Sequence, residues 1–166
     1  MLVGASAAHA LEEHYADLPV SVEVASVFNV SLDNPQLIFQ HVRPGQTDLL
    51  GEGRFFNELT CRANSGRPWY LKAQLLALKH VGRDYTLPAS RLQWKVVEAM
   101  GAATPPAGRG EFQAFTDGPV VIYASQGDAR LGSTVVIRMQ YGLSCPLDAP
   151  AGDYVGEIIF TMTESP

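Results

Sequence analysis

Side chains that could carry acid–base, metal or nucleophilic chemistry are few and scattered along this chain. Its four histidines are His9, His14, His41 and His80. None has a second His or Cys at the short spacing of zinc sites, and a separation of five residues does not align His9 with His14 on one helix face. No serine lies in a G-x-S-x-G elbow, although a Ser-His-Asp triad can assemble from distant residues. We therefore predict no enzyme, with no catalytic residue, no metal ligand and no cofactor.

The two cysteines, Cys61 and Cys145, offer a different chemistry. They do not form a C-x-x-C motif, which argues against redox catalysis and against a cysteine zinc site. An even pair in an exported chain predicts one disulfide, and a loop of this length gives about 4.5 kcal/mol in the chain-entropy model. The alternative is a pair of buried free thiols.

Composition limits the possible partners. The chain has 166 residues, a net charge of −5 and a pI near 5.3, with only 17% charged residues. An acidic chain without a run of Lys or Arg is not expected to bind nucleic acid or anionic membranes. No apolar stretch approaches the roughly 20 residues that cross a bilayer as a helix, so we predict no membrane insertion.

Residues 1–17 are expected to be a signal remnant or a short N-terminal helix. Ala8-His9-Ala10 gives an A-x-A pattern before Leu11, as at a signal-peptide cleavage site. The alternative is an amphipathic helix, because apolar residues recur every four positions from Val3 to Tyr15. The first interpretation predicts a secreted, extracellular protein.

Most of the remaining chain alternates apolar and polar residues in short runs between turn signals. About nine such runs are expected as strands, including residues 37–39, 69–76, 92–97 and 135–143. This spacing indicates an all-β, two-sheet β-sandwich over residues 35–166. Side chains predicted to be buried in its core are Trp69, Trp94, Val135, Ile137 and Tyr154.

The segment before the sandwich has the longest alternation. Val20–Leu32 reads V-S-V-E-V-A-S-V-F-N-V-S-L and contains neither Gly nor Pro. As one strand it would span roughly 40 Å, about twice an ordinary strand. Its apolar row is Val20, Val22, Val24, Phe28, Val30 and Leu32, interrupted only by Ser26. We therefore predict an extended N-terminal arm, residues 18–34, that pairs beyond its own domain as a donor strand.

The C-terminal segment from Cys145 to Met162 resembles the closing part of secreted bacterial immunoglobulin-like sandwiches. In spore-coat-U-like proteins and chaperone–usher pilins, a P-A-G-x-Y turn leads into a final alternating strand. Here that turn is Pro150-Ala151-Gly152-Asp153-Tyr154. The resemblance implies export, a β-sandwich and assembly into surface fibres by donor-strand exchange. It covers roughly twenty residues, and no pilin pattern extends over the rest of the chain.

Two functions of different classes follow. The first is a structural subunit of an extracellular bacterial filament, pilus or coat, which polymerises head-to-tail with copies of itself through the arm. The alternative is a monomeric secreted binding module, for example for carbohydrate, with aromatic residues such as Trp69, Tyr70 and Trp94 lining a groove. A periplasmic enzyme accessory domain is a third possibility. Asn29-Val30-Ser31 also fits the acceptor pattern for N-glycosylation.

Overall fold

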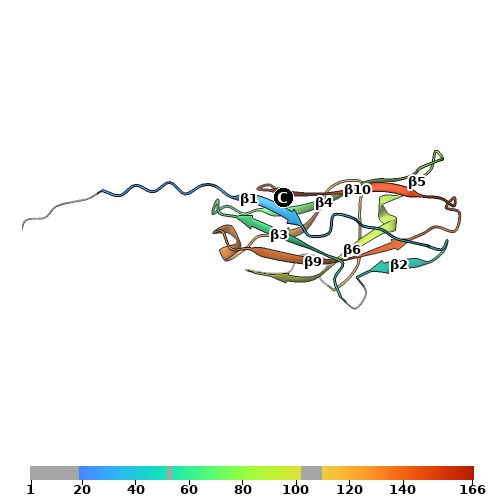
Figure 1. Ribbon diagram of the computed structural model, residues 1–166, viewed down its shortest axis with the longest axis horizontal. Coiled ribbons are helices and arrows are strands. Elements are labelled where there is room, and N and C mark those ends of the chain that lie inside the picture. Colours follow the sequence, from blue (N-terminus) through green and yellow to red (C-terminus); the bar gives the residue numbers. More distant parts are fainter. Residues whose placement is uncertain (1–18, 52–53, 102–109) are drawn as a thin grey trace, which may run out of the picture.

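The computed structural model describes residues 19–51, 54–101 and 110–166. These form two antiparallel sheets packed face to face, with an extended N-terminal segment that leaves one end of the sandwich (Figure 1). The all-β sandwich predicted from the alternating runs is confirmed. The signal remnant or helix predicted for residues 1–17 lies outside the described residues.

The larger sheet, sheet A, has the strand order β1-β3-β9-β6-β7, and β2 pairs with the far half of β9. Its strands are β1 (Phe28–Leu32), β2 (Thr47–Leu50), β3 (Asn57–Ala63), β6 (Leu92–Met100), β7 (Gln113–Ala114) and β9 (Val135–Ser144). The smaller sheet, sheet B, has the order β10-β4-β5, with β8 also pairing with β4. Its strands are β4 (Tyr70–His80), β5 (Thr86–Leu87), β8 (Val120–Ala124) and β10 (Tyr154–Thr163). Two short 3-10 turns, Ala89–Arg91 and Gly127–Arg130, complete the described elements.

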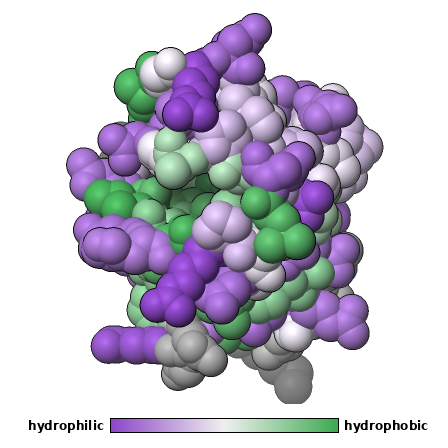
Figure 2. Space-filling model, turned by 90° about the vertical axis from the view of Figure 1, so that its right-hand side faces the viewer, coloured by the Kyte–Doolittle hydropathy of each residue, from purple (hydrophilic) through white to green (hydrophobic). Residues whose placement is uncertain are grey.

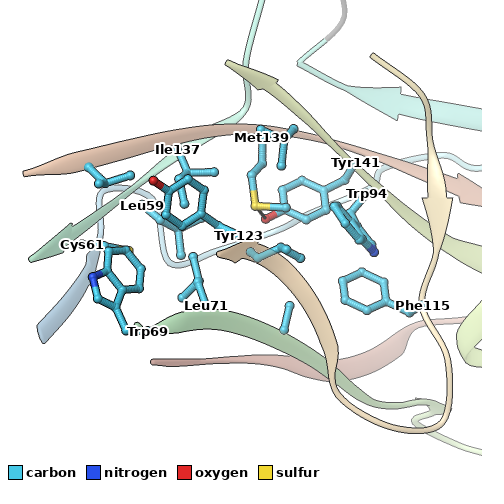
Figure 3. Close-up of a cluster of buried hydrophobic side chains, with 14 of the residues drawn as sticks. Leu59, Cys61, Trp69, Leu71, Trp94, Phe115, Tyr123, Ile137, Met139 and Tyr141 are labelled. Carbon is cyan, nitrogen blue, oxygen red and sulfur yellow. Dashed lines mark hydrogen bonds between the residues drawn. The ribbon is translucent and has the colours of Figure 1, made fainter. Parts of the chain in front are cut away.

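The core lies between the two sheets and is built from the alternate residues of β3, β4, β6 and β9 (Figure 3). The burial predicted for Trp69, Trp94, Val135 and Ile137 is confirmed, since each side chain is at most 3% exposed. Tyr154 is only partly buried because it lies at the start of β10, at the open end of the sandwich.

The long N-terminal strand is shorter than its sequence pattern predicted. Only Phe28–Leu32 forms a strand, and this strand pairs antiparallel with β3 of its own chain, from Phe28 opposite Ala63 to Leu32 opposite Leu59. Val30 and Leu32 pack against the chain's own core. The donor-strand prediction is therefore wrong for Phe28, Val30 and Leu32, because β3 offers these residues a partner within the same sheet.

The predicted disulfide is also absent, since Cys61 and Cys145 are both free thiols. Cys61 on β3 lies opposite Val135 at the beginning of β9, whereas Cys145 follows the end of β9. Ten residues of strand separate Val135 from Cys145, which corresponds to about 33 Å. A disulfide requires Cα atoms about 4.4–6.8 Å apart, so the bridge cannot form within one chain.

The strand predicted at residues 37–39 is not formed. The chain between β1 and β2 is irregular, with no ladder partner among the described residues, although Leu37 and Phe39 still pack against the core. Pro35 lies three residues after the end of β1 and lacks an amide hydrogen, so it cannot donate to a continued ladder. The short strands β2 and β5 had no alternating pattern long enough to predict them.

Candidate functional site

The first feature of the site is the exposed arm, residues 19–26, which projects away from the sandwich (Figure 1). It is extended but belongs to no strand, and its valines are almost free of contacts. Val20 is 80% exposed, and Val22 and Val24 are each 78% exposed. Three valines at alternate positions on an extended chain place their side chains on one face. The three valines therefore form an apolar row that is unusually exposed to water.

The second feature is an apolar cleft between the two sheets, enclosing about 1190 Å³. It opens at the end of the sandwich opposite the arm, where Figure 2 shows apolar side chains around a hollow. Small-molecule pockets usually occupy about 300–1,000 Å³, so this cleft is larger than most of them. Apolar side chains that line it from the strands are Leu75, Leu78, Leu87, Leu92, Tyr141, Leu143, Ile158 and Phe160.

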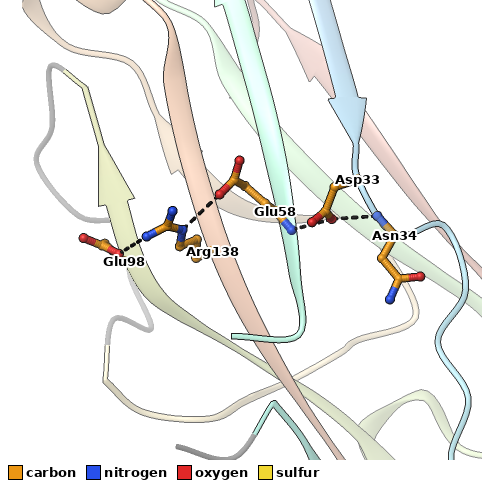
Figure 4. Close-up of polar contacts among 5 residues, drawn as sticks. All are labelled: Asp33, Asn34, Glu58, Glu98 and Arg138. Carbon is orange, nitrogen blue, oxygen red and sulfur yellow. Dashed lines mark hydrogen bonds and ion pairs between the residues drawn. The ribbon is translucent and has the colours of Figure 1, made fainter. Parts of the chain in front are cut away.

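One wall of the cleft is the irregular segment of residues 33–44, which Asp33 directs away from sheet A. Its carboxylate Oδ1 accepts the backbone N–H groups of Glu58, at 2.7 Å, and of Asn34, at 2.6 Å (Figure 4). The carboxylate thus ties the end of β1 to β3 and turns the following chain. The turned chain brings Leu37 and Phe39 over the gap between the sheets.

The sheet behind this wall is braced by charged side chains on its outer face (Figure 4). Arg138 on β9 donates from Nε to Glu58 on β3 at 2.9 Å and from Nη1 to Glu98 on β6 at 2.8 Å. The hydrogen bonds to these carboxylates raise the pKa of Arg138. Its guanidinium also lies 4.6 Å from the centre of the Phe55 ring. These contacts link three strands of sheet A.

The rim of the cleft is the Pro150–Tyr154 turn that the sequence singled out. The Tyr154 hydroxyl donates to the Pro150 carbonyl at 2.8 Å, which closes the turn. His80 accepts the Gly82 N–H at Nδ1, so its Nε2 carries the hydrogen and donates to the Ala151 carbonyl at 3.1 Å. Gly152 has φ +145°, and a Cβ there would collide with the His80 ring. The P-A-G-x-Y residues therefore shape the mouth of the cleft.

The opposite wall is β10, which forms the edge of sheet B. β10 pairs with β4 along its length, and the described residues provide no strand on its other side, although β1 lies beside part of it. The cleft follows β10 from Tyr154 to Phe160, seven residues that span about 23 Å. The arm from Val20 to Ser26 also has seven residues, so it has the same length when extended.

The two thiols have very different environments. Cys61 is fully buried on β3, and burial raises its pKa to about 12. Cys145 is partly buried and lines the cleft. Burial and the nearby Asp48 carboxylate raise its pKa, which the Arg91 guanidinium partly offsets.

The remaining sequence-based candidates are dispersed. Trp69 and Trp94 lie in the core and Tyr70 is partly buried, so they do not form an exposed aromatic platform. Asn29 is exposed on β1. Among the described residues, no three His, Cys, Asp or Glu side chains are grouped so that they could hold a metal ion. The same residues contain no helix long and apolar enough to cross a membrane.

A comparison with protein-family models and with curated proteins finds no match for this chain.

Proposed function

We propose that this chain is a structural subunit of an extracellular bacterial filament, and that it polymerises head-to-tail by donor-strand exchange. The arm of one copy, carrying Val20, Val22 and Val24, lies in the cleft of the next copy and adds a strand to the free edge of β10. The observation that carries the proposal is that the exposed apolar row and the apolar cleft have matching lengths. The resemblance at residues 145–162 supports the extracellular, bacterial part of the proposal.

The positions of the two features favour an open chain of subunits. The arm leaves one end of the sandwich and the cleft opens at the other end (Figures 1 and 2). One surface therefore meets a different surface on the neighbour, and such head-to-tail contacts extend indefinitely unless their rotation closes a ring. An arm entering from that end inserts with Ser26 at the mouth and Val20 deepest, which makes it antiparallel to β10.

The expected energy of insertion is moderate. Burying a valine gives about 1.5–3 kcal/mol, so the three valines together give roughly 5–9 kcal/mol before the cost of ordering the arm. Backbone hydrogen bonds to β10 would add about 1 kcal/mol each. Covering the edge of β10 also removes a site at which unrelated strands could aggregate.

The monomeric binding module has less support. A carbohydrate-binding surface usually presents flat aromatic rings, whereas both tryptophans are buried in the core and Phe28 is the one large aromatic counted as exposed in the described part of the chain. The cleft is also too long for an ordinary small ligand.

Alkylation of Cys145 tests the proposal, because this thiol lines the cleft. We expect iodoacetamide to modify Cys145 in the monomer at mildly alkaline pH, and assembly to slow that reaction at least tenfold. Cys61 should stay unmodified in both states, because burial keeps its thiol protonated and out of contact with the reagent. Mass spectrometry of the modified peptides measures both sites.

A control thiol outside the cleft, Asp117→Cys in a Cys145→Ser background, should react equally in monomer and polymer, because Asp117 is exposed in the loop between β7 and β8. A wild-type chain that remains monomeric at all concentrations would overturn the filament proposal. Equal reactivity of Cys145 in monomer and polymer would exclude the cleft as the point of insertion.

A further inference from the structure

The base of the arm is held by a single side chain, that of Asn64, in the loop between β3 and β4. Its Oδ1 accepts the Val27 N–H at 2.7 Å, and its Nδ2 donates to the Ala25 carbonyl at 2.9 Å. The backbone N–H of Asn64 also donates to the Val27 carbonyl at 3.1 Å. One residue thus satisfies both backbone groups of Val27, at the base of the arm, and the carbonyl of Ala25 in the arm.

These contacts continue the β1–β3 ladder by one step beyond its last strand pair, Phe28 with Ala63. The Asn64 amide carries an acceptor and a donor in one plane, so it presents the two groups that a strand edge would present. The amide therefore substitutes for backbone at the point where β3 has ended, and it keeps the arm in line with β1.

The loop that carries Asn64 is itself anchored to the sandwich. The Gly132 N–H donates to the carbonyl of Ala63 at 2.8 Å, and Arg62 donates from Nε to the Gly132 carbonyl at 3.0 Å. Asn64 is half-buried, and a Cβ placed at Gly132 would touch its Cβ at 3.5 Å. Asn64 is thus a fixed point, and its hydrogen bonds hold the chain at Ala25 and Val27, at the base of the arm.

We propose that Asn64 is a positioning residue that pre-orients the arm for insertion into the next subunit. This inference rests on the proposed function. Binding by a segment that is already ordered loses less conformational freedom, and a chain held along one line samples fewer unproductive directions. Three valines give only a moderate gross gain, so an arm that is ordered in advance assembles measurably faster than a free one.

The direction of the arm can be measured in the monomer, independently of assembly. Nitroxide labels at Glu23→Cys on the arm and Asp117→Cys on the sandwich report their separation by pulsed electron paramagnetic resonance. The background carries Cys145→Ser to remove the reactive native thiol, and Val22→Asp with Val24→Asp to keep the chain monomeric. We expect a narrow distance distribution with Asn64, and a distribution at least twice as wide with Asn64→Ala.

A second variant distinguishes loss of the arm contacts from a general folding defect. Asn64→Asp keeps the acceptor for the Val27 N–H but turns an oxygen toward the Ala25 carbonyl, so it should also widen the distribution while the melting temperature stays close to that of the parent. Ser65→Ala, in the same loop, should change neither quantity, since the Ser65 hydroxyl accepts the Arg67 N–H within that loop.

Assembly of chains with the native valines provides the second readout. Asn64→Ala should lower the rate of filament growth about tenfold at equal protein concentration. A narrow distribution in Asn64→Ala, or unchanged growth, would overturn the positioning role while leaving the filament proposal intact. A wide distance distribution in Asn64→Ala, together with a native chain that never assembles, would instead support the positioning role of Asn64 and overturn the filament proposal.

Discussion

The double variant Val22→Asp/Val24→Asp is expected to stay folded and monomeric under conditions in which the native chain forms filaments. Both valines are 78% exposed, so the substitutions cost the isolated subunit almost nothing. In the cleft, each carboxylate would replace a favourable apolar contact and lose much of its hydration among mostly apolar side chains. Loss of two of the three valine contacts alone removes about 3–6 kcal/mol, which corresponds to at least a hundredfold weaker subunit contact. Sedimentation velocity and negative-stain imaging measure the outcome.

The matched control places the same two charges on the other face of the arm. Ser21→Asp/Ala25→Asp has the same net charge as the first variant, and both positions are exposed. Side chains at odd positions point away from the cleft when the even row is inserted, so this variant should still form filaments. If both double variants assemble like the native chain, the valine row does not carry the subunit contact.

Trp69→Ala is expected to cause the largest loss of stability among single substitutions of the core, about 3–5 kcal/mol. The side chain is fully buried and packs on Tyr123 with ring centres 5.3 Å apart (Figure 3). Its indole Nε1 also donates to the Ala129 carbonyl at 3.0 Å. The substitution therefore creates a cavity and removes the donor to a buried carbonyl. Urea denaturation of an assembly-blocked chain gives the change in unfolding free energy.

Comparison of two Trp→Phe variants separates packing from hydrogen bonding. Trp69→Phe loses the bond to Ala129, whereas the Nε1 of Trp94 has no hydrogen-bond partner among the described residues. Leaving a buried carbonyl unpaired costs about 1–3 kcal/mol, so Trp69→Phe should be the more destabilising of the two. Equal losses would mean that the indole–carbonyl bond contributes nothing measurable.

The sheets could be predicted because their signal is local. Strands β6 and β9 contain runs of alternating apolar and polar residues, from Leu92 to Val96 and from Ile137 to Leu143, and that period indicates which side chains share a face. The pattern at Val20–Leu32 has the same period throughout, yet only its second half forms a strand. Periodicity indicates which side chains share a face but not which residues find a partner strand. Phe28–Leu32 pairs with β3, and that pairing depends on the tertiary fold.

The cleft and the contacts of Asn64 with the arm could not be predicted from the same signals. The cleft exists because residues from β4, β9, β10 and the irregular segment 33–44 meet in space, and no single run of sequence encodes that meeting. The role of Asn64 could not be predicted either, since a side chain bonded to residues 37 and 39 positions away leaves no local pattern. The disulfide prediction was wrong for the same reason, because the number of cysteines says nothing about the distance between them.

The most direct test of the central claim is a disulfide cross-link between the arm of one copy and the cleft of the next. An inserted arm has its base at the mouth of the cleft, where Cys145 follows the end of β9. Val24→Cys should therefore form bonds to Cys145 of a neighbouring chain under mild oxidation. Denaturing gels should show a ladder of covalent multimers, and peptides from mixed isotope-labelled chains should identify the bond as intermolecular. Ala25→Cys, one residue away on the opposite face, should give far less. A purely monomeric product from Val24→Cys, or equal ladders from both variants, would contradict insertion of the arm.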